Sequence, residues 1–115
     1  MPERGEILAA LGDVIESRRG GDVEKSYTSR LLAGGPEKAG SKVTEEAGEL
    51  VAAALGETDD RVVAEAADLL YHTLVLLTCR GLSLSDVESE LQRRFGVSGL
   101  EEKASRGATS KGEKN

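Results

Sequence analysis

Apolar and polar residues follow the period of an α-helix in four stretches of the chain. In residues 6–18, apolar side chains recur three and four positions apart, which places them on one side of a helix. The same spacing recurs in residues 36–55, between the turn "ETDD" and Arg80, and from Leu84 to Phe95. No segment alternates with the two-residue period of a strand. The pattern predicts an all-α fold, a bundle of four main helices.

Glycines, proline and short polar residues indicate where these helices begin and end. The stretch "RRGGD" breaks the first helix. "SYTSRLL" predicts a short helical piece that Ser26 caps and Gly34 and Gly35 close, and Pro36 fits the first turn of the next helix. That helix stops at Gly56. The other expected boundaries are a cap at Thr58 or Asp59, a stop at Gly81 and a cap at Ser83 or Ser85.

The second and third main helices are joined by only about four residues, which predicts an antiparallel hairpin. Each helix has an apolar stripe that we expect to form the core, and the third is apolar on nearly all sides, as buried helices are. The stripe of the second helix is Val43, Ala47, Leu50 and Ala54. The seam of the third is Val63, Ala66, Ala67, Leu70, Leu74 and Leu77. Tyr71 and Phe95 are expected in the core as well.

Five acids stand on the other sides of these two helices, in "KVTEEAGEL" and "EAADLLYH". They are Glu45, Glu46, Glu49, Glu65 and Asp68. On the second helix alone, a solvated polar face is an equally good interpretation. On the third, an ionised carboxylate within an apolar run needs a positive partner. Because Glu49 and Glu65 lie at similar distances from the turn, we expect the two acidic faces to meet at one level.

Such a cluster is typical of a metal site, because clustered carboxylates raise one another's pKa unless a cation neutralises them. Oxygen ligands favour Mg²⁺, with Mn²⁺ as the alternative. A di-iron site would need Glu-x-x-His on two helices, but His72 is the only histidine. We interpret His72 as a hydrogen-bonded packing residue or a group that holds Asp68. A metal-activated water attacking a phosphoanhydride is the predicted chemistry.

Composition and charge narrow the classes of protein. The net charge is −6, and no basic stripe with interleaved aromatic residues occurs, which argues against nucleic-acid binding. The N-terminal "MPERGEILAALG" lacks the apolar core of a secretory signal. The apolar run of residues 62–77 is short for a membrane span and contains acids. With a single cysteine, Cys79, these features predict a cytoplasmic protein without membrane partners.

The 115 residues suit one domain. We expect it to span residues 1–106, followed by a disordered tail at 107–115, where the composition turns to Gly, Ser, Thr and charged residues. A chain this short buries only about two-thirds of its unfolded surface. Completion of the bundle by a second copy, as a homodimer, is therefore expected.

Longer motifs add a family resemblance. The segments "SYTSRLL", "KVTEEA", "ADLLYH" and "SGLEEKASR" resemble phosphoribosyl-ATP pyrophosphohydrolase of histidine biosynthesis, from about Ile7 to Arg106. That family lies within the all-α nucleoside triphosphate pyrophosphatases, whose mark is Glu-Glu-x-x-Glu on one helix and Glu-x-x-Asp on the next. One departure is Thr44, where the family commonly has Gly before the acid pair.

The resemblance implies Mg²⁺-dependent cleavage of phosphoribosyl-ATP into phosphoribosyl-AMP and pyrophosphate, by a dimer. It also implies that the five acids hold metal and that one glutamate orients or deprotonates the water. Our candidate for that base is Glu46. Lys42 is the first candidate for a phosphate contact. The further substrate-binding candidates are Lys38, Arg30, Ser26, Tyr27 and Thr28, and a helix cap is an equally good role for the segment 26–28.

Two other functions remain open at this point. A housekeeping pyrophosphatase of the same group would share the acids and act on canonical or damaged nucleotides. A helical dimerisation module would carry them only for solubility, and its properties would not depend on Mg²⁺. Turnover of phosphoribosyl-ATP, dCTP and dUTP side by side separates these functions.

Overall fold

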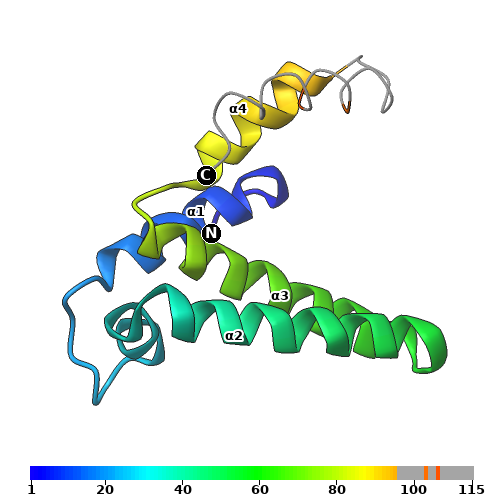
Figure 1. Cartoon of the computed structure of the whole chain (residues 1–115), viewed down its shortest axis with the longest axis horizontal. Helices are drawn as coiled ribbons and strands as arrows, with labels where there is room; N and C mark the ends of the chain where they lie inside the picture. The colour runs from blue at the N-terminus through cyan, green and yellow to red at the C-terminus, as the bar shows by residue number, and fades with distance from the viewer. Residues whose placement is uncertain (96–102, 104–105, 107–115) are drawn as a thin grey trace. The chain divides into compact units, whose positions relative to one another are not determined.

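The computed structural model describes residues 1–95, 103 and 106. Its elements, in chain order, are η1 (Arg4–Glu6), α1 (Ile7–Ser17), α2 (Tyr27–Gly56), α3 (Asp59–Cys79) and α4 (Leu84–Arg94). No strand occurs in this part of the chain. Helices α2 and α3 lie side by side and are joined by a tight turn (Figure 1). The predicted all-α class and antiparallel hairpin are confirmed.

Helix α2 contains both the short predicted piece and the second main helix. Between them, Gly35 has φ 81° and ψ −176°, a region open to glycine alone. Pro36 follows at once, where its ring and missing N–H interrupt the helical hydrogen bonds least. At the start, Ser26 Oγ accepts a hydrogen bond from the Ser29 N–H at 3.0 Å. The cap at Ser26 and the break at Gly35 both follow the sequence prediction.

The ends of α3 are also where the sequence places them. Thr58 caps the helix, its Oγ1 accepting a hydrogen bond from the Arg61 N–H at 3.3 Å. Gly81 has φ +75°, and the Leu82 N–H donates to the Leu77 carbonyl at 2.9 Å. This is the glycine-terminated arrangement common at helix ends. The next helix, α4, begins at Leu84, directly after Ser83.

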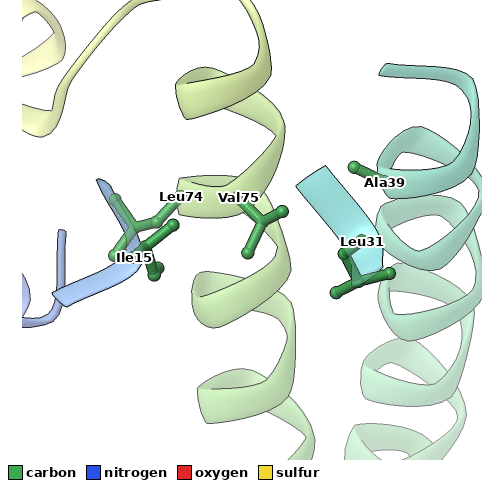
Figure 2. Close-up of a cluster of buried hydrophobic side chains, with 5 residues drawn as sticks. All are labelled: Ile15, Leu31, Ala39, Leu74 and Val75. Atoms are coloured by element: carbon green, nitrogen blue, oxygen red, sulfur yellow. The ribbon is translucent and has the colours of Figure 1, made fainter. Parts of the chain in front are cut away.

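The hydrophobic core joins three helices. Leu74 of α3 lies against Ile15 of α1, and Val75 of α3 faces Leu31 and Ala39 of α2 (Figure 2). Ile15, Leu31 and Val75 are each at most 1 % exposed. Cys79 and Tyr71 are partly buried against this cluster. Helix α3 therefore holds α1 and α2 together, and its middle is fixed on two sides.

Contrary to the sequence prediction, part of the apolar stripe of α2 and of the apolar seam of α3 does not lie in the core. Val63 is 68 % and Leu70 is 47 % exposed, so much of the apolar seam lies outside the core. Leu74 of that seam is buried, whereas Ala54 of the α2 stripe is exposed. The buried side chains in the long part of α2 and on the facing side of α3 are Ala39, Glu46, Ala53, Glu65, His72 and Val75. The acid-bearing faces therefore turn inward, between the buried residues Ala39 and Ala53 of α2.

Phe95 corrects a second expectation, because it is 90 % exposed rather than part of the core. By its contacts the chain divides into two compact units, Met1–Leu84 and Ser85–Asn115. The second unit holds most of α4, in which Glu90 pairs with Arg93 and Arg94. The expected disordered tail, 107–115, lies outside the described residues, and the single domain 1–106 remains a prediction.

By length and composition alone, α3 is the one helix among the described residues that is apolar enough to cross a membrane. It packs along α2 and carries the buried side chains of Glu65 and His72 on the packed side. A core helix of a helical bundle has the same properties.

Candidate metal centre

The α2–α3 hairpin brings all five predicted acids together. Glu45, Glu46 and Glu49 of α2 can each offer one carboxylate oxygen such that these atoms lie within 4.8 Å of one another. The same holds for Glu46 with Glu65 and Asp68 of α3. Glu46 belongs to both sets. The expectation that the acidic faces meet at one level of the hairpin is therefore correct.

Two of these carboxylates are removed from solvent. Glu65 is 4 % and Glu46 is 8 % exposed. The Oε1 atom of each is buried and has no hydrogen-bond partner. A buried polar atom without a partner is destabilising by about 1–3 kcal/mol, and more when it is charged. Two such atoms in one cluster point to a ligand that the protein itself does not supply.

The raised pKa values of two carboxylates in the cluster also indicate that a positive ligand would be favoured there. Burial raises the pKa of Glu46 from its ordinary value of 4.5 to about 7, and the nearby Glu65, Glu49 and Asp68 push it the same way. The interaction with Glu65, followed by burial, raises the pKa of Glu49. A divalent cation bound among these carboxylates would favour their charged forms and so oppose the raised pKa values of Glu46 and Glu49.

The chain supplies two cations at the edge of the cluster. Lys42 Nζ donates to Glu45 Oε1 at 3.3 Å. That hydrogen bond, followed by the nearby Tyr27, raises the pKa of Lys42. Arg61, on the first turn of α3, donates through Nη2 to Glu65 Oε2 and through Nε to Glu57 Oε1 at 3.4 Å.

A hydrogen-bonded aromatic cluster adjoins the acids and joins the start of α2 to α3. Nδ1 of His72 lies 3.0 Å from the Asp68 carbonyl oxygen, and its Nε2 lies 3.0 Å from the Tyr27 hydroxyl. Because a carbonyl only accepts, Nδ1 donates its N–H to Asp68, and the Tyr27 hydroxyl is the partner of Nε2. Thr28 Oγ1 bonds the Tyr71 hydroxyl, and Tyr27 stacks on Tyr71 with ring centroids 6.4 Å apart.

His72 is thus a hydrogen-bonded packing residue, as one of the two interpretations of the sequence held. It binds the backbone of Asp68, not its carboxylate, and both ring nitrogens are engaged. The cluster therefore offers oxygen ligands only. Carboxylate oxygens from two helices suit a hard divalent ion such as Mg²⁺ or Mn²⁺, so the residues present fit the metal that the sequence suggests.

Three of the other substrate-binding candidates, Ser26, Arg30 and Lys38, make contacts elsewhere than with the five acids. The Ser26 hydroxyl caps α2. Arg30 Nε donates to the Val23 carbonyl at 3.1 Å, in the loop before α2. Lys38 is exposed, and its side chain lies over Gly34. Among these candidates, Lys42 contacts the cluster, and Tyr27 and Thr28 reach α3 beside it.

Arg61 and Tyr71 have roles that the sequence analysis missed. Arg61 precedes Glu65 by four residues, a spacing at which helical side chains are neighbours, so this pair could have been found. The contact of Tyr71 with Thr28 spans 43 positions, and no local spacing signals it.

A family profile and individual relatives of this chain point to the same protein family. The profile of the family described as "Phosphoribosyl-ATP pyrophosphohydrolase" matches residues 8–95. A protein of Paracoccus denitrificans named phosphoribosyl-ATP pyrophosphatase is 52 % identical over 99 residues, covering 86 % of this chain and 92 % of the relative. One of the same name from Trichlorobacter lovleyi is 51 % identical over 106 residues, covering 92 % and 98 %.

A third relative with that name, from Dechloromonas aromatica, is 47 % identical over 102 residues, covering 89 % of this chain and 94 % of its own length. The matched region contains all five clustered acids and the α2–α3 hairpin that presents them. The chain belongs to the phosphoribosyl-ATP pyrophosphohydrolase family.

Proposed function

We propose that the protein hydrolyses phosphoribosyl-ATP to phosphoribosyl-AMP and pyrophosphate, the second step of histidine biosynthesis, in a reaction that depends on Mg²⁺. The observation that carries the proposal is the pair of buried, unpartnered oxygens of Glu46 and Glu65 within a cluster of five carboxylates. Family membership supports the substrate, and the all-oxygen donor set supports the ion, with Mn²⁺ as a substitute.

Each acid has a proposed task. Glu45, Glu46, Glu49, Glu65 and Asp68 hold the divalent ion, which when bound activates water and stabilises charge on the phosphates. Glu46 is the proposed base, receiving a proton at Oε1. The position of Glu46 in both sets of clustered acids, with Oε1 buried and unpartnered, supports this choice.

Substrate contacts are proposed at the edge of the cluster. Lys42 would bind phosphate, because its ammonium group lies at the edge of the carboxylate cluster, where it contacts Glu45. Tyr27 and Thr28 would contact the nucleoside, since they border the acids and Tyr27 is 47 % exposed. Roles for Ser26, Arg30 and Lys38 stay predictions; the hydroxyl hydrogen of Ser26 is still available while its oxygen caps α2.

A homodimer is the proposed assembly. Apolar side chains of the hairpin are exposed at helical spacings, and their burial against a second copy would remove them from water. They are Val51 and Leu55 of α2, and Val63 and Leu70 of α3, between 47 % and 83 % exposed. The cytoplasm is the proposed location, because the pathway intermediate is expected there.

The decisive experiment measures pyrophosphate release from phosphoribosyl-ATP by the purified protein, with Mg²⁺ and with EDTA, and with dCTP and dUTP in parallel. We expect rapid release from phosphoribosyl-ATP with Mg²⁺ and none with EDTA. Equal or faster turnover of dCTP or dUTP would contradict the proposal that phosphoribosyl-ATP is the substrate. Turnover that EDTA did not affect would contradict the proposed dependence of the reaction on Mg²⁺.

A further inference from the structure

Arg61 forms an ion pair with a buried carboxylate, that of Glu65. Its Nη2 donates to Glu65 Oε2, and the side chain of Glu65 is 5 % exposed whereas that of Arg61 is 55 % exposed. The other arm of the guanidinium reaches Glu57 Oε1 at 3.4 Å. Arg61 thus joins a carboxylate of the cluster to that of Glu57, which lies in the turn between α2 and α3.

The position of Arg61 is poor for stabilising the helix itself. It is the third residue of α3, after Asp59 and Asp60, and the partial positive charge at a helix N-terminus disfavours cations there. An arginine preceding its glutamate by four residues is also the less favourable order of such a pair. The contact is therefore better explained as a counter-charge for the buried carboxylate of Glu65.

Glu65 needs a counter-charge whenever no other cation is present. One of its oxygens, Oε1, is buried and unpartnered, and the same carboxylate lies with Glu46 and Asp68 in one oxygen cluster. Arg61 occupies the second oxygen, Oε2. Removing one partner of a buried ion pair leaves an uncompensated charge, which is strongly destabilising.

We propose, on the basis of the metal site inferred above, that Arg61 is a built-in counter-cation that holds Glu65 in the metal-free protein and competes with the divalent ion for it. The exposed, flexible side chain of Arg61 can withdraw towards Glu57, which gives it a second partner at the surface. Arg61 is a positioning residue in this scheme, because it acts through Glu65.

If the charge of Arg61 is removed, the proposal requires the stability of the metal-free protein to fall and the affinity for the divalent ion to rise. Without Arg61, the metal-free protein loses the partner of a buried carboxylate and becomes less stable. The divalent ion, in contrast, no longer meets a positive charge beside its ligand and binds more tightly. An arginine that served only the helix would lower stability without tightening the binding of any ion.

The test compares the wild type with Arg61→Gln, Arg61→Lys and the control Arg93→Gln, which alters a surface arginine–glutamate pair on α4. Mn²⁺ and Mg²⁺ are titrated by calorimetry, and thermal unfolding is followed in EDTA. We expect Arg61→Gln to bind Mn²⁺ about three- to tenfold more tightly and to melt about 2–5 °C lower in EDTA. Arg61→Lys and Arg93→Gln should bind the ion like the wild type.

Arg61→Gln binding Mn²⁺ equally or more weakly would refute this inference while leaving the metal site intact. An affinity of Arg61→Lys that matched Arg61→Gln would refute it too, because the charge would then be irrelevant. A wild type that bound neither ion would instead refute the proposed metal site. The affinity difference should shrink at high ionic strength, as screening of an exposed charge requires.

Discussion

At the scale of single residues, Glu46 is where the two sets of carboxylates overlap. It is nearly inaccessible to solvent although it lies on a helix surface with acids on both sides along the chain. Its neighbours on α3, Glu65 and Asp68, lie 19 and 22 positions further along the chain, so the shift of its pKa depends on the formation of the hairpin. Glu46 therefore reports on whether the cluster is assembled and whether a cation fills it.

The pKa of Glu46 predicts how the stability of the metal-free protein depends on pH. In the folded chain the pKa is about 7, against 4.5 in a solvated chain, so the folded state binds more protons between these values. The free energy of unfolding should decrease as the pH rises from about 4.5 to 7, and level off above. Thermal unfolding in EDTA at several pH values measures this.

The variant Glu46→Gln is the control, because it cannot titrate and should flatten the dependence between pH 5 and 7. Glu49, whose pKa is also raised, would leave a smaller slope of the same sign. Glu90 does not interfere, because its pKa is lowered to about 2 and its contribution is lost only below 4.5. A wild type that became more stable over this range would contradict the prediction.

Asp68→Asn separates catalysis from folding at a second residue. Asp68 is exposed and joins the cluster from the α3 side, so the neutral amide should abolish Mg²⁺-dependent pyrophosphate release and leave the fold intact. The metal-free variant should melt higher than the wild type, because one repelling charge is gone. Asp13→Asn on α1, also exposed, is the matched control and should retain full activity. Wild-type turnover by Asp68→Asn would overturn the metal assignment.

At the scale of elements, the break within α2 decides where the acid-bearing part of the helix begins. Gly35 adopts a backbone conformation with φ 81°, and Pro36 restarts the helix. The segment before the break places Tyr27 and Thr28 against α3, and the segment after it carries Lys42 and the three glutamates. Both halves contact α3, so the angle at Gly35 positions one edge of the cluster relative to the other.

Gly35→Ala should therefore destabilise the protein by about 1–3 kcal/mol, the cost of placing a side chain in this backbone region. Gly12→Ala in α1 is the contrast, because Gly12 is helical and a Cβ there meets nothing within 4 Å. That variant should be stabilised by up to about 1 kcal/mol. Urea unfolding curves compare the two, and equal effects of the same sign would show that the break at Gly35 is not constrained.

At the scale of the whole molecule, one chain leaves apolar surface uncovered. Val63 and Leu70 of α3 stand outside the core of the single chain, although the pattern of the sequence marks them for burial. The inner face of the hairpin is taken by the acids. In a dimer, the acidic faces would meet inside each hairpin and the apolar faces between copies.

Val63→Lys tests this arrangement, because a charged side chain in an apolar interface should convert the dimer to a monomer. Light scattering coupled to size-exclusion chromatography measures the mass. Ala9→Lys, at an exposed position of α1, is the control and should leave the mass unchanged. A monomeric wild type would refute the proposed dimer, and a dimeric Val63→Lys would move the interface away from this face.

The sequence alone determined the elements and the chemical character of the site. Helix ends and breaks depend on one or a few neighbouring residues, so they can be predicted from the local sequence. Examples are the caps at Ser26 and Thr58, the stop at Gly81 and the break at Gly35 and Pro36. The grouping of five acids also followed from spacing, since a short turn brings equal distances on two helices to one level.

Only the tertiary structure decided which apolar side chains of α2 and α3 are buried. Helix α3 is apolar on nearly all sides, so its periodicity does not single out a core face, and the rotation of each helix about its axis depends on packing across the hairpin. The same rotation placed Glu46 and Glu65 out of solvent with one oxygen of each unpartnered, and brought Tyr27 to His72 across 45 positions. Contacts between residues far apart in the chain depend on how whole helices fit together, and no local pattern encodes that fit.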